Sequence, residues 1–137
     1  MSQTAPLIYV VEDDRAIREI LEKVISDAGY EMLSCATLDE VHFFIHAERP
    51  DVLIFDNSCI EHAAGWALLS QLRAHPATAN LPIILLTMGA PYLREWSDTL
   101  HAQGCYLVEK PFELDKLLDT IATALGVKLT ERMVGGA

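Results

Sequence analysis

The chain has 137 residues, of which 51% are hydrophobic, so we expect one domain with a buried core rather than a disordered chain. Its formal net charge of −10 argues against direct binding to nucleic acid and favours a cation or a basic protein surface as a partner. The longest apolar runs, at 7–11 and 82–86, are far shorter than the roughly 20 residues that cross a bilayer, so we expect a cytoplasmic protein without membrane insertion.

Short apolar segments alternate with helical patterns along the chain. The apolar segments predict five strands, at 7–11, 32–35, 51–55, 81–86 and 106–108. Apolar residues at helical spacing predict a helix after each strand, with faces at 17–25, 41–45, 68–72, from 91 onward, and at 114–125. The strands are apolar throughout rather than alternating, which indicates a parallel sheet covered by helices on both faces. The sequence therefore predicts an α/β fold.

Local signals indicate where the helices begin and end. The segment Thr37-Leu38-Asp39-Glu40 has the form of a capping box and predicts that the second helix opens there. Pro91 suits the first turn of the fourth helix, and Gly126 is expected to end the last one. We therefore expect a domain at 1–126 and a flexible C-terminal tail at 127–137.

Polar residues follow four of the predicted strands, at the edge of a parallel sheet where ligands bind. These residues are Glu12 and Asp13, then Asp56, then Thr87, and finally Lys110. Three of them are carboxylates, which repel one another unless a cation lies between them. Oxygen ligands alone favour a hard cation such as Mg²⁺.

The same residues are suited to phosphoryl transfer. Lys110 and Thr87 offer a positive charge and a hydroxyl for the oxygens of a transferring phosphoryl group. A carboxylate beside Mg²⁺ can act as the nucleophile and form an acyl phosphate. We expect Asp56 to be that nucleophile, because it directly follows the most apolar predicted strand.

Four segments in this order resemble the bacterial response-regulator receiver family of two-component signalling, over residues 6 to about 126. They are Val10-Val11-Glu12-Asp13-Asp14, Leu53-Ile54-Phe55-Asp56, Leu85-Leu86-Thr87 and Lys110-Pro111-Phe112. The resemblance implies a flavodoxin-like, doubly wound five-stranded parallel sheet flanked by five helices.

The resemblance also implies roles for single residues. Asp56 would be the phosphoacceptor, and it would share a Mg²⁺ ion with Glu12, Asp13 and the main-chain carbonyl of Ser58. Thr87 and Lys110 would contact the phosphoryl group.

The chain departs from the family pattern near the expected switch. The loop after Asp56 is one residue longer than usual, and the bulky Met88 follows Thr87 where a small residue is typical. Leu107 stands at the place of the switch aromatic, and Tyr106 lies one residue earlier. Either a bulge moves Tyr106 into that role, or the usual coupling is absent or altered. We expect an output that does not follow the usual rotation of an aromatic side chain.

The resemblance implies a single-domain response regulator that receives its phosphoryl group from a sensor histidine kinase or a phosphotransfer protein. It would catalyse only its own phosphorylation and dephosphorylation, and would signal through changed contacts with a downstream protein target. The alternative is a receiver-like protein-binding module that works without phosphorylation. An aspartate-nucleophile phosphatase is disfavoured because Ser58 stands where such enzymes need a second acid. The fourth helix, around Trp96, is a candidate surface for dimers and targets.

Other potential ligands have simpler interpretations. His42 and His46 lie four apart on one predicted helix, but no third ligand is evident, so we expect a solvated helix face. Cys35, Cys59 and Cys105 form no paired motif and are expected to be small core thiols.

Overall fold

The structure is a computed structural model, which describes residues 5–37, 40–56, 63–87, 97–102, 104–109 and 113–136. Its five parallel strands are β1 (Leu7–Val11), β2 (Glu31–Cys35), β3 (Val52–Asp56), β4 (Ile83–Thr87) and β5 (Cys105–Glu109). They form one sheet in the order β2-β1-β3-β4-β5. The helices within these ranges are α1 (Arg15–Asp27), α2 (Val41–Glu48), α4 (Ala63–Ala74), α6 (Ser97–Ala102) and α7 (Leu114–Gly136). The doubly wound α/β fold predicted from the sequence is confirmed.

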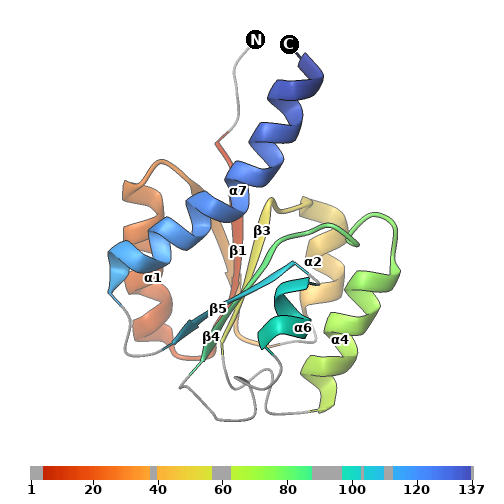
Figure 1. Ribbon diagram of the computed structural model, residues 1–137. Helices are drawn as coiled ribbons and strands as arrows, with labels where there is room; N and C mark the ends of the chain where they lie inside the picture. The colour runs from red at the N-terminus through yellow and green to blue at the C-terminus, as the bar shows by residue number, and fades with distance from the viewer. Residues whose placement is uncertain are drawn as a thin grey trace.

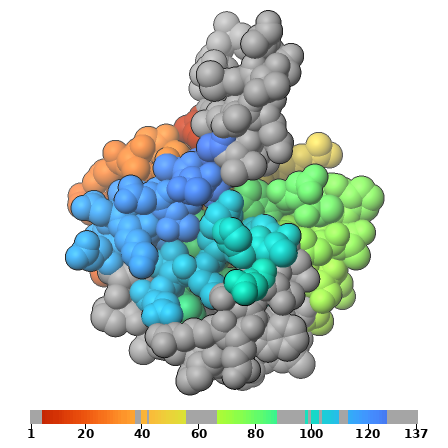
Figure 2. Space-filling model, in the orientation of Figure 1, coloured from red at the N-terminus to blue at the C-terminus, as the bar shows by residue number. Residues whose placement is uncertain are grey.

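Helices cover both faces of the sheet (Figure 1). Side chains of α2, α4 and α6 pack on one face, against every second residue of the strands, such as Tyr9, Leu53 and Leu85. Side chains of α1 and α7 pack on the other face, against the residues between them, such as Val10 and Ile54. Figure 2 shows the atoms of α6 and β5 between those of α7 and those of α4. This double burial explains why the strands are apolar at consecutive positions.

The predicted capping box does not form. Helix α2 begins at Val41 with Glu40 as its N-cap, and the Glu40 side chain makes no capping hydrogen bond. The Thr37 hydroxyl donates to the Glu40 carboxylate over 3.5 Å, a contact between the two side chains rather than the reciprocal side-chain to main-chain pair of a capping box. Leu38 and Asp39 lie outside the described residues.

The prediction that the last helix ends at Gly126 is also wrong. Helix α7 continues through this residue to Gly136. Gly126 does not adopt a positive φ, whereas Gly29, just beyond the end of α1, has a φ of 95°. A glycine ends a helix when it takes the left-handed conformation, and inside a helix it costs only about 1 kcal/mol. The flexibility of residues 127–137 stays a prediction.

Two of the three cysteines are buried free thiols, as predicted. Cys35 and Cys105 are 5% and 1% exposed, and Cys59 lies outside the described residues. Burial raises the pKa of both thiols, because the thiolate loses its hydration in the core. Their role is therefore packing rather than reactivity.

None of the helices in the described part of the chain is both long enough and apolar enough to cross a membrane. The cytoplasmic location expected from the sequence stays a prediction.

Arg73 joins three segments at the amino-terminal end of the sheet. From the last turn of α4, its guanidinium donates to the carbonyls of Thr78 and Ala79 at 3.1 and 3.3 Å, and to that of Gly104 at 3.5 Å. It thereby holds the turn that leads into β4 against the residue that precedes β5. Hydrogen bonds from a charged donor to carbonyls are stronger than neutral ones.

Replacement of Arg73 by methionine, Arg73→Met, should lower the free energy of unfolding by about 1–3 kcal/mol, because the partly buried carbonyls lose their donors. The exposed Arg15, which pairs with Glu19 at 3.1 Å, provides the matched control. Arg15→Met should change the same quantity by less than about 0.5 kcal/mol. Urea unfolding followed by circular dichroism measures both, and equal losses would contradict the role given to Arg73.

Candidate functional site

The strand register brings the predicted site residues to one edge of the sheet. Val11 of β1 lies beside Phe55 of β3, so Glu12 follows β1 at the level where β3 ends in Asp56. Asp56 pairs with Leu86 of β4, which Thr87 follows. Because all these strands are parallel, their carboxyl ends meet at this edge. The backbone therefore places Glu12, Asp56 and Thr87 in a row across three neighbouring strands.

Glu12 is held firmly in this row. Its side chain is buried, with 2% of its surface exposed, and its Oε1 accepts a hydrogen bond from the Asp14 main-chain N–H at 3.2 Å. Its own N–H donates to the Cys35 carbonyl at 3.0 Å, which ties it to β2. Arg18 donates to the Glu12 carbonyl at 2.9 Å. A buried carboxylate is costly unless it is paired, so this position suits a cation ligand.

The two aspartates after Glu12 have different environments. Asp14 is the N-cap of α1, and its Oδ1 accepts from the main-chain N–H groups of Ala16 and Ile17 at 2.9 and 3.3 Å. Asp13 is exposed and makes no such cap. The acidic run therefore combines a helix cap with acids that are available to the site.

The structure describes only part of the remaining predicted set. Asp56 is the last residue of β3, but its side chain is not described, and Thr87 is a buried polar residue at 2% exposure. Ser58, Met88 and Lys110 lie outside the described residues. The roles predicted for these five residues stay predictions.

The donors at this edge have the chemistry that Mg²⁺ requires. Glu12, Asp13 and Asp56 are all acids, and carboxylate oxygens are the donors that Mg²⁺ prefers. Among the side chains that the structure describes, which do not include that of Asp56, no three acids, histidines or cysteines form a metal-binding group. The fit to Mg²⁺ therefore rests on the donor type and on the strand register.

The register of β5 decides where the two possible switch residues lie. Strand β5 pairs with β4 without interruption, from Cys105 beside Ile83 to Glu109 beside Thr87, so no bulge shifts Tyr106. Leu107 packs on the same face as Leu85, which is also the face of Thr87 by alternation. Tyr106 packs on the opposite face, and its ring contacts His101 with centroids 5.7 Å apart. Leu107 rather than Tyr106 is thus placed to follow changes at Thr87.

A family model described as the response regulator receiver domain matches residues 8–122. The chain belongs to this family. Its members are the receivers of two-component systems, in which phosphorylation and Mg²⁺ binding are typical. The order of acids, threonine and lysine along the chain is thus the arrangement of a receiver.

The chain is similar to one curated regulator and to two solved receiver structures. It is 31% identical to the DNA-binding transcriptional regulator NtrC of Salmonella typhimurium over 124 residues, which cover 87% of this chain and 24% of NtrC. A putative response regulator structure from Chloroflexus aurantiacus is 30% identical, with a TM-score of 0.77, and the match covers 90% of this chain and 99% of that one. The receiver domain of the Pseudomonas aeruginosa sensor histidine kinase PA1611 has a TM-score of 0.72 at 22% identity, covering 90% and 99% of the two chains. The chain therefore spans about a quarter of the length of NtrC.

Arg18 contributes to the site and was not predicted from the sequence. Its contact with the Glu12 carbonyl arises because the Asp14 cap directs the first turn of α1 back over the end of β1. The sequence signal for this contact is the position of Arg18. It lies one turn after the N-cap Asp14 and six residues after Glu12, the acid that follows β1.

Separate substitutions should distinguish the two kinds of acid. Asp14→Ala should lower the free energy of unfolding by about 1 kcal/mol through loss of the cap. Glu12→Gln should weaken Mg²⁺ binding at least about tenfold, since even outer-shell partners of a metal contribute that much. Isothermal titration calorimetry and thermal unfolding measure the two effects. Unchanged Mg²⁺ affinity in Glu12→Gln would exclude Glu12 from the metal site.

Proposed function

We propose that the chain accepts a phosphoryl group on Asp56 from a sensor histidine kinase or a phosphotransfer protein, in a Mg²⁺-dependent reaction, and signals through changed protein–protein contacts. The observation that carries the proposal is the strand register, which sets Asp56 between the buried carboxylate of Glu12 and the buried hydroxyl of Thr87. An acid at the centre of a parallel sheet edge, between a metal ligand and a hydroxyl, is suited to phosphoryl transfer.

The proposed reaction is a displacement at phosphorus. A carboxylate oxygen of Asp56 attacks the phosphoryl group of a phosphohistidine, the P–N bond breaks, and the imidazole leaves and takes up a proton. The product is an acyl phosphate, which water later hydrolyses to inorganic phosphate and the free carboxylate. Thr87 donates a hydrogen bond and Lys110 supplies positive charge to the phosphoryl oxygens. The protein would act only on itself, without turnover of a separate substrate.

Bound Mg²⁺ would neutralise the charge that gathers on the phosphoryl oxygens. Glu12 and Asp13 would hold it together with Asp56 and the main-chain carbonyl of Ser58. The receiver domain of PA1611 supports this assignment, because its structure contains a magnesium ion in the active site cleft. The oxygen donors at the corresponding edge of this sheet support it from the chain itself.

A second candidate function is that of a receiver-like binding module that signals without phosphorylation. The observation in its favour is Leu107, an aliphatic side chain on the face of Thr87 where an aromatic side chain is usual. The acids, Thr87 and Lys110 favour phosphorylation, which is therefore the first proposal. The same proposal includes a downstream protein target and a dimer formed through the segment around Trp96. That segment lies outside the described residues.

Incubation with acetyl phosphate and Mg²⁺ should add one phosphoryl group to the wild-type chain and none to Asp56→Asn, because an amide is not a nucleophile for this step. Chelation of Mg²⁺ with EDTA should abolish the wild-type reaction. Intact-mass spectrometry measures the gain, and hydroxylamine should remove it, since it cleaves acyl phosphates. A gain that survives in Asp56→Asn would refute Asp56 as the acceptor, and no gain in the wild type would favour the binding module.

The output should proceed without inward rotation of Tyr106. In a structure with Mg²⁺ and beryllofluoride, which imitates the phosphoryl group, the Tyr106 ring should keep its contact with His101. The reason is that Tyr106 and Thr87 lie on opposite faces of the sheet. A structure in which Tyr106 fills space behind a displaced Thr87 would contradict this expectation.

A further inference from the structure

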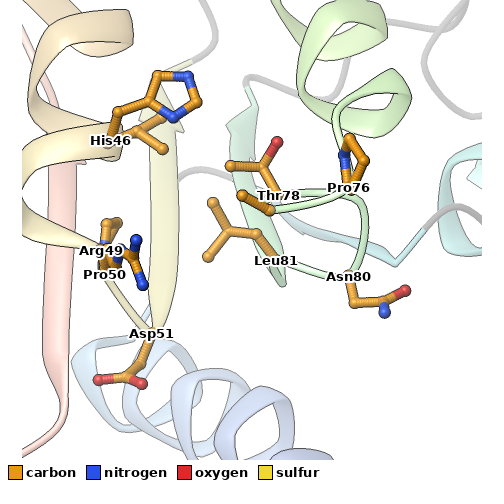
Figure 3. A pocket seen from close by; sticks show the side chains of 10 residues that line it. His46, Arg49, Pro50, Asp51, Pro76, Thr78, Asn80 and Leu81 are labelled. Carbon is orange, nitrogen blue, oxygen red and sulfur yellow. The ribbon is translucent and has the colours of Figure 1, made fainter.

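A cleft of about 460 Å³ lies at the end of the sheet opposite to Asp56. It opens between the connection from α2 to β3 and the turn that joins α4 to β4, and Figure 3 shows side chains from both segments facing its space. Pro50 and Asp51 precede β3, and Leu81 precedes β4, so the cleft is at the amino ends of these strands. Its volume is that of a small-molecule site.

Buried apolar side chains form one part of the cleft wall, and exposed polar residues form the rest. Ile45, Pro50 and Leu81 are buried residues that line it, and Pro76 completes the side formed by the α4–β4 turn. Thr78 is also buried, but its hydroxyl donates to the Leu72 carbonyl at 2.6 Å and is not available to a ligand. These buried residues give the cleft a preformed apolar surface against which a ligand can pack.

Arg49 provides an uncommitted positive charge at this cleft. Other described arginines are engaged: Arg15 pairs with Glu19, and Arg18 and Arg73 donate to main-chain carbonyls. The guanidinium of Arg49 makes no hydrogen bond and no ion pair within the described ranges, in a chain whose net charge is −10. Arg49 also has a φ of 50°, a left-handed conformation at the end of α2 that glycine usually adopts. A strained residue that lines a cleft is a reason to look for a ligand.

His46 adds a second nitrogen donor on the same side. Its ring lies above Arg49 in Figure 3 and contacts the ring of His75 with centroids 4.9 Å apart. The Nδ1 of His75 accepts a hydrogen bond from the Ala77 N–H at 3.1 Å, which fixes that ring. The ring nitrogens of His46 have no hydrogen-bond partner among the residues described. The described residues include no group of three metal-ligating side chains, so His46 is better suited to a hydrogen-bonding ligand than to a metal.

The acid at the cleft is tied to β1 rather than directed into the cleft. Asp51 is the one acidic residue among the described residues that line the cleft, and its Oδ2 accepts from the Leu7 N–H at 2.9 Å. Figure 3 shows its carboxylate at the margin, directed away from His46 and Leu81. The formal charges of Arg49 and Asp51 sum to zero over the whole cleft, but the donors of Arg49 and His46 are separated from the carboxylate at the margin.

We propose that this cleft binds a small organic anion with a flat apolar body and one acidic head group. The head group pairs with the guanidinium of Arg49 and accepts from His46, and the body lies against Ile45, Pro76 and Leu81. Charge complementarity favours an anion, because the guanidinium of Arg49 has no ion pair among the described residues. The site is separate from the proposed phosphoryl site, since it lies at the other end of β3 and β4.

The test uses two dyes of the same shape, 8-anilinonaphthalene-1-sulfonate and its uncharged analogue N-phenyl-1-naphthylamine. The full chain should bind the sulfonate at least about tenfold more tightly than the analogue, because a charge-assisted pair contributes about that factor. Fluorescence titration gives both affinities. Shifts in the NMR signals of the Ile45 and Leu81 methyl groups locate the bound dye.

Matched variants separate the cleft from general charge. Arg49→Asn removes the cation but tolerates the left-handed backbone, and it should weaken sulfonate binding about tenfold. Arg49→Lys keeps the charge and should retain most of the affinity, and the distant Arg15→Gln loses the same charge and should bind as the wild type does. His46→Gln, which involves no strained backbone, should weaken binding by a smaller factor. Thermal unfolding confirms that each variant is folded.

Two results would overturn the proposal. One is equal affinity for the charged and uncharged dyes, and the other is sulfonate binding that both Arg49→Asn and His46→Gln leave unchanged. Methyl shifts confined to residues outside the cleft would count equally against it. Because phosphorylation is not measured in this experiment, its outcome is independent of the proposal for Asp56.

Discussion

The site depends on one constraint, the burial of the central strands on both faces. Every residue of β4 is buried, and residues 52–55 of β3 are buried as well, so neighbouring residues pack into two different layers. A slip of one position would exchange the two layers and place each side chain against the wrong helices. The register is therefore fixed by packing over the whole length of the strands. That register sets Glu12 level with Asp56 at the carboxyl edge, with Thr87 one residue further along β4.

The buried carboxylate of Glu12 shows how the fold and the proposed chemistry depend on each other. Its burial has an energetic cost, and the hydrogen bond from the Asp14 N–H offsets part of it. The cap formed by Asp14 and the contact from Arg18 hold the chain in the path that keeps Glu12 inside. Under the proposed function, a divalent cation would add a further favourable interaction with this carboxylate.

The sequence predicted those features that depend on period and order. Strands such as β1 and β4 were predicted because their apolar runs are uninterrupted. The sequence left open whether a bulge moves Tyr106, and the uninterrupted register of β5 excludes that bulge. Features that depend on tertiary contacts were not predicted. Gly126 would end a helix only if its backbone adopted the left-handed conformation. Arg73 and Arg18 donate to carbonyls in other segments of the chain, and no local sequence motif marks these contacts. The approach of His75 to His46 likewise results from the packing of two separate connections.

The two ends of β3 bring opposite charge environments into one small domain. Five residues, Val52–Asp56, separate the acidic edge from the cleft beside Arg49, a distance of about 17 Å for an extended strand. The Debye length at physiological ionic strength is about 8 Å, so direct charge interaction between the two sites is largely screened along the solvent path. An anion at Arg49 and a phosphoryl group at Asp56 therefore need not compete. Any coupling between the two sites would have to pass through the packed strand β3, which both sites share. Because the strand is tightly packed, it does not deform gradually when one site binds its ligand.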